Sequence, residues 1–169
     1  MEERKKIFFG TYFYSENGEK KPIEWIVLEE TQQDMLLISL YGLEAIAFDS
    51  NSNNWEPSSL RAWLNGDFKK EAFAKAEQSK IQGDITILDI DESRKYFGET
   101  ADQLKPTPYA AARGAFISRD DGSTWWWLRS QGAQPNMAAF VYNDGTLFPD
   151  GSLVSRDNGA VRPVIRIKK

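Results

Sequence analysis

The segment from residue 131 to 159 mixes aromatic side chains with small polar and charged ones. Aromatic side chains supply a large contact area at low entropic cost, and short polar groups adapt their hydrogen bonds to a partner. This mixture is typical of a ligand-contacting surface, and the competing interpretation is a set of plain solvated hairpin loops. The candidate ligand-binding residues are Gln134, Asn136, Phe140, Tyr142, Asn143, Phe148, Asp150, Ser152, Arg156, Asp157 and Asn158.

Carboxylates are the other candidates for chemistry, because the chain contains no Cys and no His. That absence excludes thiol nucleophiles, disulfides, zinc fingers and Ser-His-Asp triads. A glycosidase needs two carboxylates that converge on one bond, and the densest acidic clusters are residues 89–92 and 120–122. However, Asp121-Gly122 is typical of a turn, and residues 89–92 favour a helix cap over a calcium loop. A carboxylate-dependent hydrolase of carbohydrate or cell-wall material is the alternative to binding.

No glycine-rich nucleotide-binding motif occurs, so the sequence predicts no nucleotide cofactor, and no metal site is predicted either. The run Trp125-Trp126-Trp127 allows two interpretations. In a strand, Trp125 and Trp127 face one side and Trp126 the other. Burial of these large side chains in the core is favoured over an aromatic platform for a sugar or peptide.

The composition and net charge predict the class of protein that carries these groups. The 169 residues are 41% apolar and 27% charged, which predicts one soluble globular domain over residues 1–169. A net charge of −4 argues against a nucleic-acid partner. No apolar run is long enough for a signal sequence or membrane span, so we expect a cytoplasmic protein without a membrane partner; phage association or export by another route are the alternatives.

The charge is uneven along the chain. Residues 1–122 carry 15 basic and 22 acidic side chains, whereas residues 123–169 carry 6 basic and 3 acidic ones. Because Glu and Lys favour exposed helix faces, their loss predicts that the final 65 or so residues form strands and loops. We therefore expect a helix-and-strand framework over residues 1–122 and a strand-and-loop region over residues 123–169.

Hydrophobic patterns predict the elements of the framework. Strands are expected over residues 7–14, 23–30, 35–40 and 85–90, the first three as an antiparallel meander with the third at its centre. Ser58 or Ser59 caps a helix that Gly66 ends, and a second helix covers residues 68–78. Asp91 caps a short helix over residues 92–97, with Gly98 after it. Further strands are expected at residues 125–130, 138–142, 146–148 and 161–167.

Two longer motifs carry a family resemblance. They are WExSSLRxWLN from Trp55 to Asn65, and WWLRS from Trp126 to Ser130 followed by Val161-Arg162-Pro163. Together with Pro22-Ile23-Glu24-Trp25 they resemble an uncharacterised domain family, of unknown function, in bacteria and their phages. That resemblance covers nearly the whole chain.

The C-terminal part also resembles the C-type lectin-like fold, in the branch of formylglycine-generating enzymes and retroelement-diversified variable proteins. The resemblance rests on Arg129-Ser130 and on residues 159–162. It implies an α+β fold with small antiparallel sheets and a loop-rich C-terminal half. It also implies that the loops between those two strands bind ligand, with a framework beneath them of Trp126, Trp127, Leu128, Arg129 and Arg162.

Some properties of these relatives do not transfer. Formylglycine-type oxidases need reactive cysteines, which this chain lacks. Gln134-Pro135-Asn136 and Tyr142-Asn143-Asp144 look like the calcium-binding tripeptides of lectins, but they lie closer together than usual and the usual disulfides cannot form. Diversification of adenines in Asn codons fits the scarcity of Lys and Glu in the segment. Gln131, Gln134 and Met137 then have to be fixed positions.

The sequence as a whole predicts a non-catalytic domain that binds a protein or another macromolecule through residues 131–158. Phe140, Tyr142 and Phe148 are the expected anchors if their side chains face outward. Hydrogen bonds and charges of the neighbouring polar residues set specificity. A third interpretation is a purely structural module of a phage or larger assembly.

Overall fold

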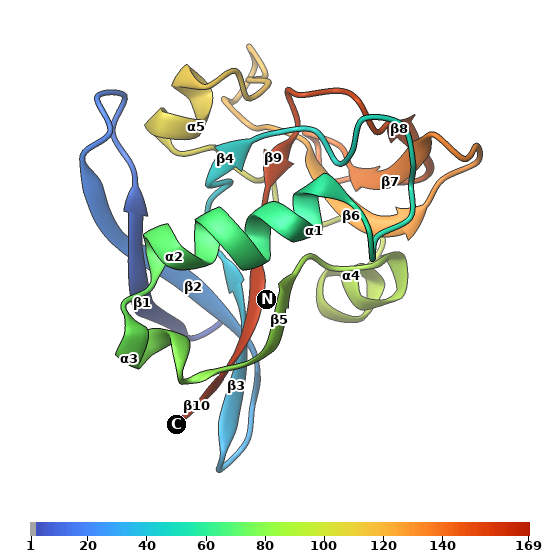
Figure 1. Cartoon of the computed structure of the whole chain (residues 1–169). Coiled ribbons are helices and arrows are strands. Elements are labelled where there is room, and N and C mark those ends of the chain that lie inside the picture. The colour runs from blue at the N-terminus through green and yellow to red at the C-terminus, as the bar shows by residue number, and fades with distance from the viewer. Residues whose placement is uncertain (1–2) are drawn as a thin grey trace.

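The chain folds into two five-stranded sheets and several short helices in the computed structural model, which describes residues 3–169 (Figure 1). This arrangement confirms the predicted α+β class. The first sheet has the order β1-β2-β3-β10-β5 and the second the order β4-β9-β6-β7-β8. The strands are β1 (Lys6–Phe13), β2 (Lys20–Glu30), β3 (Asp34–Ser39), β4 (Glu44–Ala45), β5 (Ile81–Thr86), β6 (Trp126–Gln131), β7 (Met137–Val141), β8 (Leu147–Leu153), β9 (Ala160–Val161) and β10 (Val164–Lys168).

The predicted meander of β1, β2 and β3 is confirmed, with β3 at the centre of the first sheet. Along β2 the residues Ile23, Trp25 and Val27 are buried, because alternate side chains of a strand point to the same face. The prediction of one strand over residues 161–167 is wrong. Pro163 cannot donate a ladder hydrogen bond, and here it separates β9 of the second sheet from β10 of the first.

One long helical stretch crosses the core face of the first sheet, formed by α1 (Ser59–Trp63), the wider π-helical turn η1 (Leu64–Phe68) and α2 (Lys69–Ala72). Ser58 caps its start by accepting from the Arg61 N–H. Gly66 does not end it, contrary to the prediction, because burial of Phe68 and Ala72 outweighs the roughly 1 kcal/mol that a helical glycine costs. The stretch ends at Phe73, whose backbone is extended, and α3 (Lys75–Gln78) follows separately.

Two further helices depart from the predictions. Asp89, not Asp91, caps α4 (Ile90–Phe97) in a capping box: the Asp89 carboxylate accepts from the Glu92 N–H, and the Glu92 carboxylate accepts from the Asp89 N–H. The helix therefore occupies the end of the strand predicted at 85–90, and β5 lies earlier in the chain. In addition, α5 (Pro108–Ala112) lies within the final 65 residues, where none was expected; the Thr107 cap followed by Pro108 is its signal.

Residues 131–159 contribute the end of β6 and all of β7 and β8 to the second sheet, and the rest of the segment forms turns and loops. Trp125, Trp126 and Trp127 are all buried, and Trp126 packs in a different hydrophobic cluster from the other two, as the alternation predicted. The strand predicted at 146–148 is too short. It continues as β8 through a bulge at residues 149–151, so that Phe148 pairs with Phe140 and Ser152 with Ala138.

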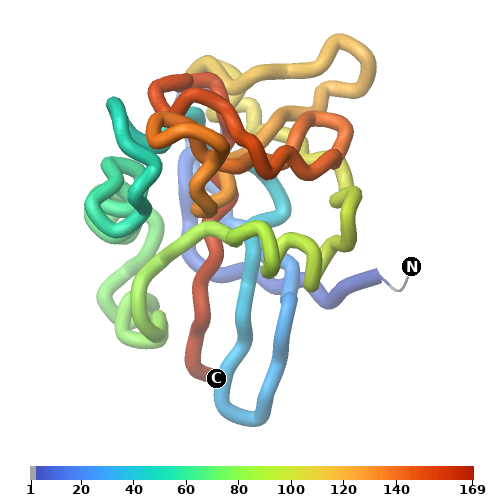
Figure 2. The backbone as a smooth tube through the Cα atoms, turned by 90° about the vertical axis from the view of Figure 1, so that its right-hand side faces the viewer, coloured from blue at the N-terminus to red at the C-terminus, as the bar shows by residue number. Residues whose placement is uncertain are grey.

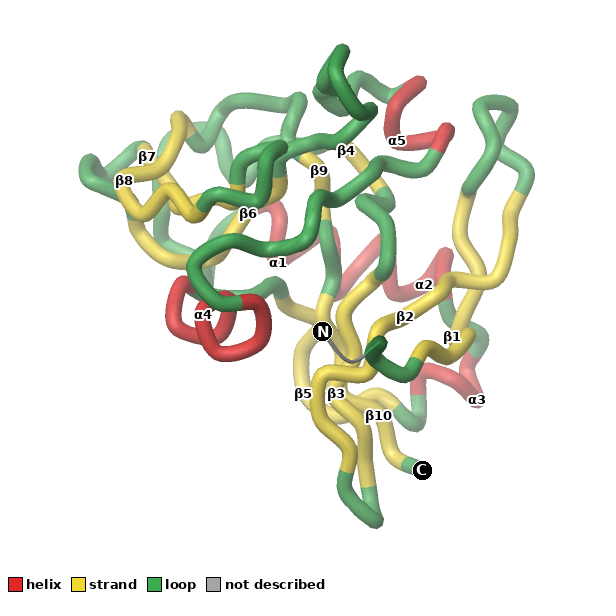
Figure 3. Tube along the Cα trace, turned by 180° about the vertical axis from the view of Figure 1, so that it is seen from behind, coloured by secondary structure: helices red, strands yellow, loops and turns green. Residues whose placement is uncertain are grey.

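The two ends of the molecule differ in character. Figure 2 shows the β2–β3 hairpin and the C-terminus at one end, and the loops of the C-terminal third at the other. Figure 3 shows the same arrangement from behind, with β3, β5 and β10 at the end that carries the C-terminus and long loops around the strands of the second sheet. The division into a framework over residues 1–122 and a strand-and-loop region over residues 123–169 stays a prediction. Each sheet takes a strand from the other part, since β4 lies in the second sheet and β10 in the first.

Candidate functional site

Three of the candidate residues form one aromatic patch, defined here as Phe140, Tyr142 and Phe148. The rings of Phe140 and Phe148 stack with centroids 5.1 Å apart and planes 7° apart. The Tyr142 ring lies 5.6 Å from that of Phe148. Tyr142 and Phe148 are each 41% exposed, whereas Phe140 is half-buried against Trp125. The register of β7 against β8 brings these rings together, since paired residues share a face of the sheet.

The turn beside the patch, residues 142–145, is held from two sides. The Gly145 N–H donates to the Tyr142 carbonyl, and the Asp144 carboxylate accepts from the Thr146 N–H, which lowers the pKa of Asp144. Gly145 also accepts from the Ala101 N–H, in a contact so close that an added Cβ would lie 2.0 Å from the Ala101 oxygen. Asn143 is half-buried, and its Oδ1 has no partner among the described residues. The patch is thus supported by a turn of fixed shape.

Gln134 and Asn136 lie at the other end of β7, away from the patch. They belong to the β6–β7 turn, where Asn53 donates from Nδ2 to the carbonyls of Gln134 and Met137, both at 3.0 Å. Residues 52–54 and 131–135 line an open polar groove here of about 380 Å³. Residues 52–54 were not among the candidates, because nothing in their spacing links them to a turn some 80 residues later.

Asp150 and Ser152 lie on the bulged strand β8. The Asp150 carbonyl accepts from the Ala133 N–H while its side chain is exposed. Gly151 has φ +87° and approaches the Ala138 carbonyl so closely that a Cβ would lie 2.4 Å from its oxygen. These two candidates therefore lie on β8 beyond Phe148, and they belong neither to the aromatic patch nor to the lining of the polar groove.

Arg156, Asp157 and Asn158 form the loop that leads into β9. Arg156 and Asp157 are exposed, and the Asn158 carbonyl accepts from the Phe116 N–H at 2.9 Å. This contact places the exposed Phe116 and Ile117 beside the loop. Sequence reasoning missed both, although an apolar pair in a polar stretch was the available signal.

Arg129 and Arg162 tie the second sheet to its surroundings beneath these loops. Arg129 donates to the Ile87 carbonyl and to the carboxylates of Glu92 and Asp89, which fixes the start of α4. Arg162 is buried, donates from Nε to the Ser39 carbonyl, and lies over the ring of Trp126. Burial lowers the pKa of Arg162 to about 9, so the guanidinium is still protonated at neutral pH. Both arginines are framework groups rather than exposed ligand contacts.

The structure thus does not gather the eleven candidates into one site. Three form the aromatic patch, Asn143 lies in the turn beside it, Gln134 lines the polar groove and Asn136 follows it, Asp150 and Ser152 lie on β8, and residues 156–158 form the loop that leads into β9. Across residues 3–169, the helices are all too short or too polar to cross a bilayer. The arrangement defines an α+β protein whose C-terminal part brings the three rings of the aromatic patch together, two of them exposed.

Part of the chain matches a known protein family. Residues 32–106 match a family described as "Domain of unknown function (DUF6273)". The match contains the WExSSLRxWLN motif and runs from the β2–β3 turn to the residues just before α5, so it confirms the expected resemblance for this segment. It stops short of the aromatic patch. No curated protein and no solved structure matches the chain.

Proposed function

We propose that this protein is a non-catalytic binding domain that holds a protein or another macromolecule against the aromatic patch. The observation that carries the proposal is the pair of exposed rings of Tyr142 and Phe148. Phe148 stacks on Phe140, which packs against the core residue Trp125, and the Tyr142 ring meets both Phe rings at an angle. Aromatic side chains of this kind are the commonest anchors of protein interfaces.

The rigidity of the patch supports the proposal. A side chain that must be immobilised on binding costs free energy, and the cost falls when it is already ordered. Phe148 is held by Phe140, and the turn next to Tyr142 is fixed through Gly145 and Ala101. A partner would therefore meet preorganised rings, each worth up to about 2 kcal/mol when fully covered.

We assign the specificity to exposed charged groups of the same segment, residues 131–159. Asp150, Arg156 and Asp157 extend from the same half of the molecule and carry charges of both signs. Rim charges of this kind act mainly on the association rate and on the choice of partner. Their contribution should weaken with added salt, whereas that of the rings should not.

We further propose that the fold is C-type lectin-like. Two neighbouring strands support this: β6, which carries Arg129-Ser130, pairs in parallel with β9 through Trp126 and Ala160. The intervening residues 131–159 would then correspond to the ligand-binding loops of that fold. Membership among retroelement-diversified variable proteins is tested by the gene's surroundings: a reverse transcriptase gene and a near-copy of the 3′ end of this gene are expected beside it.

Site-specific photo-crosslinking tests the binding proposal. A benzophenone side chain at position 142 should capture a discrete partner from host cells, while the same group at position 70, on the exposed face of α2, should not. With the captured partner purified, Tyr142→Ala and Phe148→Ala should each weaken binding about tenfold or more. Phe8→Ala, which removes an equally large exposed ring from the first sheet, is the matched control.

Two results would contradict the proposal. The first is binding to the captured partner that survives the double substitution Tyr142→Ala/Phe148→Ala. The second is release of soluble sugars or peptides from cell-wall material by the wild-type chain, which would favour the carboxylate-dependent hydrolase instead.

A further inference from the structure

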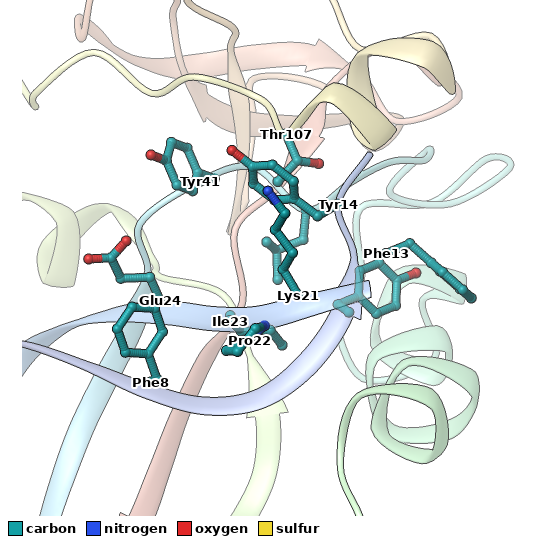
Figure 4. A pocket seen from close by; sticks show the side chains of 11 residues that line it. Phe8, Phe13, Tyr14, Lys21, Pro22, Ile23, Glu24, Tyr41 and Thr107 are labelled. Carbon is teal, nitrogen blue, oxygen red and sulfur yellow. The ribbon is translucent and has the colours of Figure 1, made fainter. Parts of the chain in front are cut away.

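A second candidate site lies in the first sheet, far along the chain from the aromatic patch. Its walls are the β1–β2 hairpin, Tyr41 after β3, and Thr107 before α5, and they enclose a pocket of about 220 Å³ (Figure 4). We call it the tyrosine pocket. Its lining residues are Phe8, Tyr12, Phe13, Tyr14, Lys21, Pro22, Ile23, Glu24, Tyr41, Leu43 and Thr107.

The floor of the tyrosine pocket is apolar and fixed. Ile23 and Leu43 are buried there, and the Tyr12 hydroxyl donates to the buried Glu44 carboxylate at 3.0 Å. Glu44 is in turn held by Arg113 at 3.1 Å. Because the Tyr12 hydroxyl is already engaged, this residue presents its ring rather than a polar group to a ligand.

The polar groups gather at the mouth. Figure 4 shows the hydroxyls of Tyr14 and Tyr41, the Lys21 ammonium and the Glu24 carboxylate on the same side of the pocket. The Tyr14 and Tyr41 rings meet edge to face at 6.3 Å, and Phe8, which is 67% exposed, forms the outer rim. Burial raises the pKa of the Tyr41 hydroxyl, with smaller effects of Tyr14 and Glu24, so the group is a protonated donor at neutral pH.

Charge at the mouth limits the class of ligand. The Lys21 ammonium lies 4.4 Å from the centre of the Tyr14 ring, which is where a cationic ligand would bind. It therefore repels a cation from this place, while Glu24 repels an anion. A purely apolar ligand would strip water from both charges and from two hydroxyls without replacing their hydrogen bonds.

We propose that the tyrosine pocket binds a neutral saccharide ring. Such a ring has an apolar C–H face that packs on aromatic walls and hydroxyls that both donate and accept hydrogen bonds. Glu24 accepts from ligand hydroxyls, Lys21 donates to them, and the tyrosine hydroxyls do both. The volume fits one six-membered ring with substituents, since a cavity of about 150 Å³ holds benzene.

Saturation-transfer NMR tests this proposal on the full chain. The probes are the methyl glycosides of glucose, galactose, mannose and N-acetylglucosamine, with N-acetylphenylalaninamide as a non-sugar probe. At least one glycoside should receive saturation from wild-type protein. Its affinity should fall about tenfold in Tyr14→Phe/Tyr41→Phe, which keeps both rings and removes both hydroxyls, and in Lys21→Met, which alters only an exposed side chain.

Tyr142→Phe is the matched control, since it removes a hydroxyl from the aromatic patch and should leave glycoside binding unchanged. A loss with Tyr142→Phe but not with Tyr14→Phe/Tyr41→Phe would assign the sugar to the other site and overturn the proposal. Absence of transfer to all four glycosides would overturn it as well, as would saturation of N-acetylphenylalaninamide alone. Partner binding at the aromatic patch is measured separately, with Tyr142→Ala and Phe148→Ala against the captured partner, so either proposal can fail while the other stands.

Discussion

The β1–β2 and β7–β8 hairpins both bring aromatic side chains to the surface, but they arrange them in opposite ways. In β7–β8 the rings of Phe140, Tyr142 and Phe148 lie against one another, and none of the three is an acidic or basic residue. In β1–β2 the rings surround a space, and Lys21 and Glu24 lie at its mouth. Rings packed against one another offer contact area to a large partner, whereas rings around a space with two opposite charges at its mouth suit a small polar one. The same residue types therefore support two different kinds of recognition.

The largest expected effect concerns how firmly the β7–β8 hairpin is fixed. Gly145→Ala places a Cβ 2.0 Å from the Ala101 oxygen at a residue whose φ is +91°, so unfolding in urea should show a loss of about 3 kcal/mol. Gly122→Ala also requires a positive φ, +77°, but meets nothing within 4 Å and should lose only about 1 kcal/mol. Equal losses would mean that contact with Ala101 does not fix the hairpin.

The second effect concerns the floor of the tyrosine pocket. Tyr12→Phe removes the hydroxyl that donates to the buried Glu44, and the free energy of unfolding should fall by about 2 kcal/mol. Tyr142→Phe removes a hydroxyl from an exposed ring of the other hairpin and should stay within about 0.5 kcal/mol of wild type. If the two variants lost the same unfolding free energy, the hydrogen bond from Tyr12 to Glu44 would not be what fixes the floor of the pocket.

A third, smaller effect compares one exposed ring from each hairpin. Phe148→Ala should cost about 1 kcal/mol, because this ring stacks on Phe140 although it is 41% exposed. Phe8→Ala should change the thermal midpoint little, since the Phe8 ring is 67% exposed. If Phe8→Ala proved the more destabilising variant, the patch would not be the self-supporting cluster described here.

The smallest effect is a pH dependence in the first sheet. Hydrogen bonds from Lys95, Tyr96 and Arg166 hold the pKa of Glu29 at about 2, below its ordinary 4.5. Because the folded pKa is the lower one, the stabilisation is complete above about pH 4.5 and is lost as the pH falls towards 2. Solvent screening keeps it under about 1 kcal/mol, since the side chain is a third exposed. Urea unfolding of Glu29→Gln across this range should show a flatter acid dependence, and an unchanged slope would contradict the assignment.

Local patterns were enough to predict much of this fold. The alternation in Ile23, Trp25 and Val27 placed β2 correctly, and the Ser58 cap placed α1. The alternation of the three tryptophans also predicted their burial on two faces. These predictions succeeded because each depends on residues within one or two turns of chain.

The failures came from contacts between distant segments. The helix runs through Gly66 because Phe68 and Ala72 are buried against the sheet, which local propensity cannot reveal. Similarly, the grouping of Phe140 with Phe148 depends on the bulge in β8, and the tyrosine pocket joins residues 8–24 to Tyr41 and Thr107. A sequence pattern identifies aromatic residues, but pairing register and long-range packing decide whether they stack or surround a space.

The position of β10 has a consequence for biosynthesis. This strand, formed by Val164–Lys168, lies between β3 and β5 and is the strand that joins β5 to the rest of the first sheet. While the chain is being translated, β1, β2 and β3 can pair as they emerge, but β5 has to wait for residues synthesised about 80 positions later. Until then the β3 edge exposes unpaired backbone groups and apolar side chains. The nascent chain is therefore most exposed to misassembly until β10 leaves the ribosome.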